Sequence, residues 1–407
     1  MTSRSRLRLG LAGIVLFALL GAGCASVGKD ELVIGEFGSL TGNDATFGIS
    51  TQRGVEVALD ELTAKKEGRI GGLKVRVVVE DDRGMAEEAA TVVQKLINQD
   101  RVLAVLGEVA SSRSLAGGPI CQQAGVPMIS PSSTNPDVTK KGDYIFRMCF
   151  LDDFQGWVMA KFVAEDLKLK KVAVLKDVKN DYSVGLAGFF TEAFQKMGGT
   201  VVLETSYSAG DADFRAALTS IKARNPEAVI VPGYYTEAGQ IARQARELGI
   251  KVPLIGGDGW ESEKLIEIGG EAMNGCFYSN HWALDAPDPK LQDFLKAYRD
   301  KFKGDPDAIG GLAYDAANVL FQSMEQLSTQ DPKAFAALGS SKVGSEDRKA
   351  ACHKLRDLIA ATAKYPGVTG NITLDANRNA SKPAVVIEIK DGKKQLRTTI
   401  APPTQPA

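Results

Sequence analysis

The sequence holds only two histidines, His281 and His353, and none of the motifs that mark common enzyme families. Neither histidine is close in sequence to a serine that follows a predicted strand, and there is no GxSxG nucleophile elbow. A P-loop and a GxGxxG fingerprint after the first predicted strand are also missing. The sequence therefore lacks the motifs that nucleophilic catalysis and nucleotide binding require. We predict no enzyme activity, no catalytic residue and no cofactor.

Cysteine is scarce and scattered. The chain has five cysteines, and those after Cys24 lack the CxxC spacing of zinc and redox sites. Export would permit disulfides, but four cysteines allow three pairings and the sequence does not choose among them. Buried free thiols are the alternative that we favour for Cys121, Cys149, Cys276 and Cys352. Asp81 and Asp82 resemble a metal pair, yet a solvated loop is the better interpretation, and we predict no metal site.

Long apolar runs and basic blocks are absent after the first segment. No stretch beyond residue 23 is apolar over the roughly 18 residues of a candidate membrane helix. Without residues 1–23 the chain loses three arginines and no acids, which takes its net side-chain charge from −1 to −4. Mild acidity without a basic block argues against nucleic acid as a partner.

Residues 1–23 have the pattern of an export signal. A basic start is followed by an apolar run from Leu9 to Ala22, which is shorter than the roughly 20 residues of a membrane-spanning helix. The segment Leu19–Cys24 resembles a bacterial lipobox, in which the cysteine is lipidated, although Gly21 stands where leucine is usual. We predict a signal peptide at 1–23 and a lipid on Cys24 that anchors the exported protein to a membrane, facing the periplasm or the cell exterior. The alternative is a soluble signal with an incidental cysteine.

From about residue 30, short β-type runs alternate with amphipathic helical segments. Leu73, Val75, Val77 and Val79 alternate with the period of a half-buried strand, whereas residues 102–106 form a continuous apolar run that suits a buried parallel strand. Repeated strand–helix units form right-handed βαβ units in parallel sheets. Because the scheme restarts near residue 150, we predict an α/β fold with two doubly wound parallel-sheet lobes.

The last third of the chain complicates this scheme. Its helical stretches and late strands predict that the chain returns to the first lobe and ends in the second. We predict an N-terminal lobe from 30–150 plus 283–374, and a C-terminal lobe from 151–282 plus 375–396. Residues 397–407 are expected to form a loose tail. The stretch from Asp331 to Ala351, rich in Ser, Lys, Asp and Gly, is expected to be a surface excursion.

Open parallel sheets bind ligands beyond the carboxyl ends of their strands, so the residues that follow each strand are candidates. The first lobe offers hydroxyls and helix-opening amides there, which suit an anion such as a carboxylate. The second lobe offers tyrosines and an aspartate, which suit a cation and an apolar body. A zwitterion with an apolar side chain satisfies both lobes. The candidates are Ser111, Ser112, Ser132, Ser133, Thr134, Tyr182, Tyr234 and Asp258.

Here the sequence resembles one family, the branched-chain amino-acid-binding proteins of ABC importers, over about residues 30 to 395. Its motifs occur in the family's order and spacing, and they are Met128–Pro136, Asp181–Gly185, Gly233–Gln240, Gln244–Gly249 and Gly257–Gly259. The resemblance implies a type I periplasmic-binding fold, in which two lobes joined by a hinge close on the ligand. It also implies delivery of the ligand to the membrane subunits of an ABC permease. We expect the protein to be a monomer.

The resemblance also implies roles for individual residues. Ser111 and Thr134 match the positions that hold the α-carboxylate, and backbone groups of Ser132 and Ser133 join them. Asp258 matches the acid that holds the α-ammonium, with help from the loop that bears Tyr234.

The resemblance places Phe47, Tyr182 and Tyr234 around the ligand's side chain. The family carries Glu at the position of Asp258 and Tyr at that of Phe47. Because Trp260 is large and adjacent, we expect a re-shaped pocket whose preferred side chain stays open.

Each candidate also has a structural alternative. Ser111 and Ser112 could cap a helix, which Pro119 would kink or delay. Residues 132–134 and Asp258 could be turns, and the tyrosines could be packing residues. At the level of function, the alternative is a sensor module for an amide, urea or a small organic acid.

Overall fold

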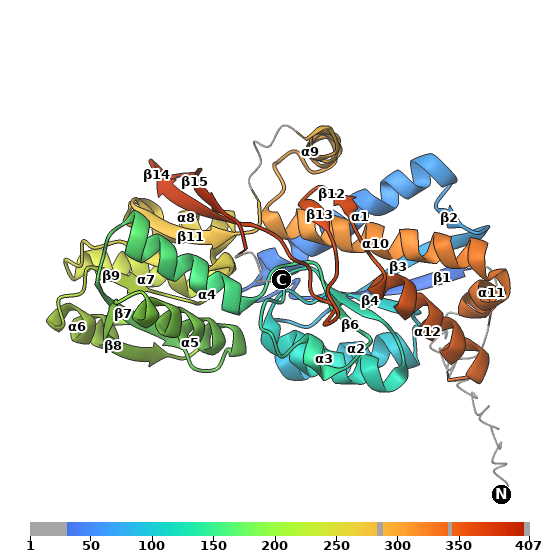
Figure 1. The fold of residues 1–407 in the computed structure, drawn as a ribbon, viewed down its shortest axis with the longest axis horizontal. Coiled ribbons are helices and arrows are strands. Elements are labelled where there is room, and N and C mark those ends of the chain that lie inside the picture. Colours follow the sequence, from blue (N-terminus) through green and yellow to red (C-terminus); the bar gives the residue numbers. More distant parts are fainter. Residues whose placement is uncertain (1–30, 283–287, 341–343, 403–407) are drawn as a thin grey trace, which may run out of the picture.

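The computed structural model describes residues 31–282, 288–340 and 344–402. The predicted signal peptide at 1–23 and Cys24 lie outside the described residues. Two α/β lobes lie side by side, each built on its own sheet (Figure 1). The predicted fold class is therefore confirmed. In the described ranges, no helix combines the length and apolar character needed to cross a membrane.

Six strands form the sheet of the N-terminal lobe, in the order β2-β3-β1-β4-β5-β6. Their bounds are Glu31–Gly38 (β1), Arg69–Ile70 (β2), Leu73–Asp81 (β3), Ala104–Leu106 (β4), Met128–Ser130 (β5) and Ile145–Arg147 (β6). All pair in parallel except β2, which forms a short antiparallel edge. The carboxyl ends of β1 and β3–β6 therefore meet at one edge of the sheet.

Helices cover both faces of this sheet. They are α1 (Ala45–Lys66), α2 (Ala86–Asn98), α3 (Ser111–Ala124), α9 (Pro289–Phe302), α10 (Ala308–Gln330), α11 (Pro332–Ser340) and α12 (Glu346–Ala360). On β1, Leu32 and Ile34 pack towards α1 and α10, whereas Val33 packs towards α2. Because successive strand residues point to opposite faces, this apolar run supplies both cores.

Seven strands form the sheet of the C-terminal lobe, in the order β15-β14-β11-β10-β9-β7-β8. They are β7 (Lys171–Asp177), β8 (Thr200–Tyr207), β9 (Ala228–Ile230), β10 (Leu254–Gly256), β11 (Cys276–Asn280), β14 (Ala384–Lys390) and β15 (Lys393–Ile400). Strands β7 to β11 are parallel, and β14 and β15 add an antiparallel edge. The helices are α4 (Asp152–Lys161), α5 (Asp181–Lys196), α6 (Arg215–Ala223), α7 (Tyr235–Glu247) and α8 (Glu263–Gly269).

Short elements complete the described chain. They are η1 (Thr139–Lys141), the π-helical turn η2 (Phe162–Asp166), η3 (Asp258–Trp260), η4 (Gly270–Met273), β12 (Tyr365–Gly367) and β13 (Gly370–Ile372). Strands β12 and β13 form a separate two-stranded sheet.

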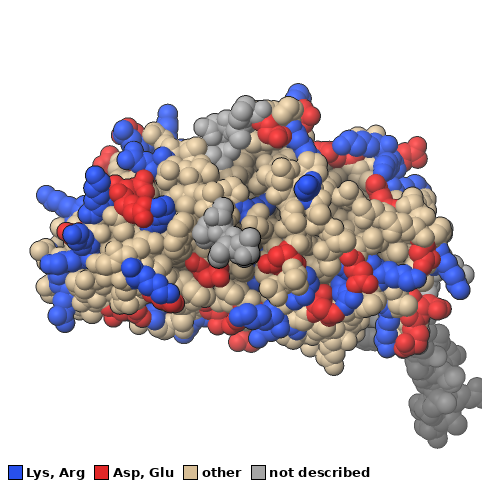
Figure 2. Space-filling model, in the orientation of Figure 1, with Lys and Arg blue, Asp and Glu red and all other residues tan. Residues whose placement is uncertain are grey.

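The chain passes between the lobes after β6, after β11 and before β14. On the last passage, Arg378 still donates to the main-chain oxygens of Ile145 and Thr139 in the N-terminal lobe. The predicted boundary at 375 therefore lies too early, and we retain the other lobe boundaries as a proposal. On the face seen in Figure 2, basic and acidic side chains are interspersed over both lobes.

Two local expectations were wrong. The stretch from Asp331 to Ala351 is not an irregular excursion, because most of its described residues belong to α11 and α12. Phe335 and Leu338 are buried at helical spacing, a signal that the polar composition around them concealed.

The predicted loose tail at 397–407 is also wrong in its first part, because residues 397–400 belong to β15. Asp391 and Gly392 have positive φ angles of 52° and 69° and join paired residues of β14 and β15. An Asp-Gly pair is a favoured two-residue hairpin turn, so the sequence contained this signal. Residues 403–407 lie outside the described part of the chain.

Further expectations concern cysteines, metals and Pro119. Cys121, Cys149, Cys276 and Cys352 are all free and buried, as favoured. No group of residues suited to a metal occurs in the described ranges. Pro119 lies inside α3, which begins at Ser111, so a late start of this helix is excluded.

Glu36 is a buried acid on β1, only 2% exposed. Burial raises the pKa of its carboxyl from 4.5 to about 8, and the Glu56 carboxylate adds to the increase. The folded protein thus holds this proton more tightly than the unfolded chain, so the contribution to stability falls as pH rises from about 4.5 to about 8. We expect Glu36→Gln to stabilise the protein more at about pH 8 than at about pH 5, measured by urea unfolding.

The matched control is Glu31→Gln on the same strand, whose carboxylate is partly exposed and pairs with Arg76 at 3.2 Å. We expect this control to show little pH-dependent gain. An equal effect of Glu36→Gln at both pH values would contradict the assignment of a buried, protonated Glu36.

Candidate functional site

Loops at the carboxyl ends of the two sheets border a small cavity of about 10 Å³. It is lined by Phe47, Val109, Ser132, Thr134, Tyr182, Tyr234, Asp258, Gly259 and Ile309. This is the position at which open parallel sheets bind ligands. All of the predicted binding residues line the cavity except Ser111, Ser112 and Ser133.

A larger hollow of about 910 Å³ lies between α1, α8 and the β14–β15 hairpin. Its acids already have partners, because Glu261 accepts from the Tyr278 hydroxyl at 2.5 Å and Asp307 from Ser50 at 2.5 Å. In the small cavity, by contrast, the buried hydroxyl of Tyr234 has no hydrogen-bond partner among the described residues. Buried polar groups without partners are costly, so the small cavity is the better candidate for a ligand site.

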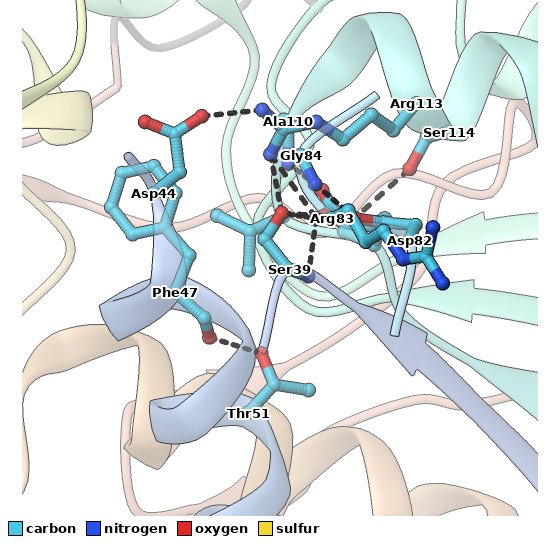
Figure 3. Close-up of polar contacts among 12 residues, drawn as sticks. Ser39, Asp44, Phe47, Thr51, Asp82, Arg83, Gly84, Ala110, Arg113 and Ser114 are labelled. Atoms are coloured by element: carbon cyan, nitrogen blue, oxygen red, sulfur yellow. Dashed lines mark hydrogen bonds and ion pairs between the residues drawn. The ribbon is translucent and has the colours of Figure 1, made fainter. Parts of the chain in front are cut away.

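The first wall is fixed by a buried charged cluster beneath the loop between β4 and α3 (Figure 3). The Glu108 carboxylate accepts from the Ala110 amide and from the Ser39 hydroxyl at 3.0 Å. Arg113 donates to Ser39 at 2.7 Å and pairs with Asp44. Burial raises the pKa of Glu108 to about 8, and the nearby Asp82 adds to this, whereas Arg113 lowers it. The cluster joins β1, β3, α1 and α3, so it holds the start of α3 in place.

Ser111 is the first residue of α3 but does not cap it, since Ala110 is the N-cap. The Ser111 hydroxyl is buried and accepts from the Asn135 amide at 3.2 Å. Ser112 accepts from the amide of Asp181 in the other lobe at 2.9 Å. The capping alternative is therefore wrong, and in this closed arrangement both hydroxyls hold neighbouring loops instead.

The loop after β5 divides its side chains between structure and cavity. The Ser133 hydroxyl can donate to either of two main-chain oxygens of the β4–α3 loop. These are the oxygen of Glu108 at 2.9 Å and that of Val109 at 3.0 Å. Ser133 thus ties the two loops together. Ser132 and Thr134, on either side of it, present their side chains to the cavity.

The second wall is centred on Asp258, the first residue of η3, which is 7% exposed. Its side chain does not cap its own turn. One carboxylate oxygen accepts from Gln155 at 2.7 Å, and the other lies 2.9 Å from Nε2 of His281. A purely local turn role is therefore insufficient, because the carboxylate points to partners on α4 and beyond β11.

Three aromatic rings form the apolar part of the cavity. Phe47 meets Tyr234 edge-to-face, with ring centroids 5.2 Å apart, and Tyr182 stacks on Tyr234 at 5.5 Å. The Tyr182 hydroxyl accepts from the Gly259 amide at 3.1 Å. Burial raises the pKa of both tyrosines well above its usual value, which keeps the phenols neutral. These aromatic residues can both pack against one another and contact a ligand, because all three line the cavity.

Three polar residues behind this wall were not predicted from the sequence: Asp152, Gln155 and His281. Asp152 is fully buried and neither oxygen has a hydrogen-bond partner in the described part of the chain. Burial raises its pKa well above the usual value, and the Asp258 carboxylate adds to this. The spacing of Asp152 and Gln155 at i, i+3 on α4 was a usable signal.

Ser132, His281 and Asp258 lie together, yet they do not form a nucleophilic triad. Ser132 Oγ and Asp258 Oδ2 both approach Nε2 of His281, at 3.2 and 2.9 Å. A triad needs the hydroxyl on one ring nitrogen and the carboxylate on the other. Nδ1 of His281 is buried without a partner among the described residues. This arrangement therefore orients groups but does not activate a serine.

Trp260 does not shape the cavity, contrary to expectation. Its ring is fully buried and Nε1 donates to the main-chain oxygen of Val231 at 3.0 Å. The ring covers β10 so closely that a Cβ on Gly256 would lie 2.1 Å from it. Trp260 is thus a core residue that supports the turn bearing Asp258.

The family model described as periplasmic binding protein matches residues 31–394. An amino acid binding protein of Pseudomonas aeruginosa is 32% identical over 81% of this chain and 87% of its own length. Among solved structures, the leucine binding protein LivK of Thermotoga maritima is 36% identical with a TM-score of 0.82, covering 91% of this chain and 99% of its own. LivJ of Streptococcus pneumoniae, solved with isoleucine, is 33% identical with a TM-score of 0.81, covering 91% and 100%.

More distant structures share the fold. A solute binding protein of R. palustris, solved with benzoate, is 22% identical with a TM-score of 0.77 and covers 91% of this chain and 97% of its own. At this identity the likeness concerns the fold alone.

Proposed function

The chain belongs to the periplasmic binding protein family, and on this premise we propose that it captures a small apolar amino acid by lobe closure and delivers it to an ABC permease. The observation that carries the proposal is the cavity itself. It is enclosed between a wall with hydroxyls and a wall with a buried carboxylate, and aromatic rings lie between them. Only a ligand with an anionic end, a cationic end and an apolar body satisfies all three.

The anionic end belongs to the N-terminal lobe in this proposal. Ser132 and Thr134 can donate their hydroxyl hydrogens to a carboxylate, and the first turn of α3 is joined to their loop by the Asn135 amide, which donates to Ser111. Ser111 lies at the start of that turn, 1% exposed. A modest opening of the lobes would bring its hydroxyl to the ligand, so we keep Ser111 as a binding residue. Ser133 contributes through the position of its backbone.

The cationic end belongs to Asp258. Gln155 and His281 each approach one carboxylate oxygen, and a carboxylate has about four acceptor sites, so it can still accept from an ammonium. If the lobes closed on a deaminated acid, the Asp258 carboxylate would be buried without an ammonium to balance its charge. Because burying an unpaired charge is costly, the site favours the amino acid over the corresponding organic acid.

The side chain would contact Phe47, Tyr182 and Tyr234, with Val109 and Ile309 completing an apolar surface. In this closed arrangement the cavity of about 10 Å³ has room for about one water, so the loops must move apart to admit an amino acid. The apolar lining favours a branched-chain or similarly small apolar side chain.

Closure is supported by direct contacts between the lobes. Thr46 bonds to Ser262 at 3.0 Å, and the Thr236 hydroxyl donates to the Asn43 oxygen at 2.7 Å. Separating the lobes would break these contacts, and a ligand that bridges the walls would shift the population towards the closed state. The closed form is what a permease would meet. We propose further that a lipid on Cys24 keeps the monomeric protein at the membrane.

A thermal-shift screen against the twenty amino acids, benzoate, urea and a simple amide tests the proposal. At a ligand concentration of 100 times Kd, binding contributes about 2.7 kcal/mol to stability, enough for a clear rise in Tm. We expect one or more small apolar amino acids to raise Tm and the other compounds to leave it unchanged. A rise with benzoate, urea or the amide but with no amino acid would favour the sensor or organic-acid alternative and overturn the proposal.

A further inference from the structure

His281 lies where the chain leaves β11 for the N-terminal lobe, and it is 3% exposed. Its ring stacks on Phe150, with centroids 4.0 Å apart and planes 29° apart. Phe150 lies on the first passage between the lobes, after β6. The two passages thus fix the imidazole in the middle of the hinge, directly behind both walls of the cavity.

The imidazole joins the two walls through a single atom. Nε2 is 2.9 Å from Asp258 Oδ2 in the C-terminal lobe and 3.2 Å from Ser132 Oγ in the N-terminal lobe. A carboxylate only accepts hydrogen bonds, so the contact with Asp258 requires the hydrogen on Nε2. An Nε2 that carries this hydrogen cannot accept from Ser132. The Ser132 hydroxyl must therefore donate its hydrogen to another acceptor. Because Ser132 lines the cavity, a bound ligand can be that acceptor.

We infer that His281 is a positioning residue that sets the polarity of both walls and so makes the cleft select ligands with an ammonium and a carboxylate together. Towards one wall it orients the Asp258 carboxylate that receives the ammonium. Towards the other it forces Ser132 to act as a donor to the carboxylate. This inference rests on the proposed function, because it concerns the same site.

Neighbouring groups support this role over a purely structural one. A packing histidine would satisfy its polar atoms locally, yet Nδ1 of His281 has no partner among the described residues. Within the described ranges, the hydrogen bonds of the ring run through Nε2 to two residues that line the cavity. The Gln155 amide holds the other Asp258 oxygen at 2.7 Å, so His281 and Gln155 together fix the carboxylate plane.

Two substitutions separate the hydrogen bond from the packing. His281→Phe keeps an aromatic ring against Phe150 and removes Nε2. His281→Gln loses the ring but keeps an N–H donor at a similar distance along the side chain. The readout is the ratio of two Kd values measured by calorimetry: that of the amino acid selected by the screen and that of its deaminated acid, which has the same carboxylate and side chain.

We expect the wild-type protein to prefer the amino acid, and His281→Phe to reduce this preference about tenfold or more, as for loss of a charged hydrogen bond. His281→Gln should keep the preference within a few-fold. His353→Phe, at the exposed histidine of α12, is the matched control and should change nothing. If His281→Phe does not fold, His281→Leu also removes Nε2 while keeping an apolar side chain, and the ratio of the two Kd values remains the readout.

A structural role predicts the opposite pattern. Both ligands would then weaken together, the ratio would stay unchanged, and the phenylalanine variant would do better than the glutamine variant. That pattern would overturn the inference and leave the proposed function standing. If the wild-type protein bound the deaminated acid as tightly as the amino acid, or bound neither, the proposed function would fail and this inference with it.

Discussion

Replacing Asp258 by asparagine is expected to weaken amino-acid binding by about 2–5 kcal/mol, or roughly 30-fold to several thousand-fold in Kd. The carboxylate is 7% exposed and is the charged group that lines the cavity. Asparagine keeps the size of the side chain and one acceptor, so the loss isolates the charge. The ligand ammonium would then be buried without a counter-charge, which accounts for the size of the effect. Isothermal titration calorimetry measures it directly.

Asp293→Asn is the matched control, because this aspartate is exposed on α9 and does not line the cavity. It removes the same charge from the same chain and should leave Kd within about twofold. If Asp258→Asn bound every amino acid as tightly as the wild-type protein does, Asp258 would have no place in the ligand site.

Trp260→Ala is expected to lower the free energy of unfolding by about 3–5 kcal/mol, the usual cost of removing a large aromatic ring from a core. The ring is fully buried, its Nε1 bonds to Val231, and it covers the backbone of β10 at Gly256. Removing it leaves a cavity and an unpaired carbonyl oxygen. Because η3 carries both Trp260 and Asp258, binding should weaken as well. Urea unfolding measures the stability change.

Trp157→Ala provides the comparison within the same lobe. Trp157 is only partly buried on α4, where it stacks on Phe154 with centroids 6.1 Å apart. We expect this substitution to cost clearly less than Trp260→Ala and to leave ligand affinity unchanged. Similar losses for both tryptophans would contradict the role of Trp260 as the core support of the second wall.

The elements that sequence predicted well are those with a strong local period. On β1, alternate residues pack into the cores on the two faces of the sheet, as the apolar run required. The loops after β4, β5, β9 and β10 then had to meet at one edge, because parallel strands share a direction. This is why Thr134, Tyr234 and Asp258 were predicted together although they are far apart in sequence.

What the sequence could not provide is the direction of side chains within loops. Ser132 and Ser133 are adjacent and chemically alike, yet one borders the cavity and the other bonds to the β4–α3 loop. Trp260 was expected to crowd the ligand, but the short turn of η3 directs it into the core. Such choices depend on backbone angles that composition and period do not encode.

His281 was not predicted for a different reason. It follows β11, so the rule that led to Asp258 would also have led to it. Cys276–Asn280 is short and ends in polar residues, and it was not predicted as a strand. Because this strand was not predicted, His281 was not predicted as a wall residue. The link that it makes between Ser132 and Asp258 was therefore not predicted either. The strand β14 was predicted, but its hairpin partner β15 was missed, because its charged residues resemble a tail.

The most direct test is a crystal structure of the protein with the amino acid that the screen selects. We expect the ligand's α-carboxylate to accept hydrogen bonds from Thr134 and Ser132, and its ammonium to lie within hydrogen-bonding distance of Asp258. Its side chain should lie against Phe47 and Tyr234. A ligand bound in the larger hollow beside α8, or with its carboxylate turned towards Asp258, would contradict the central claim that the two walls have opposite electrostatic preferences.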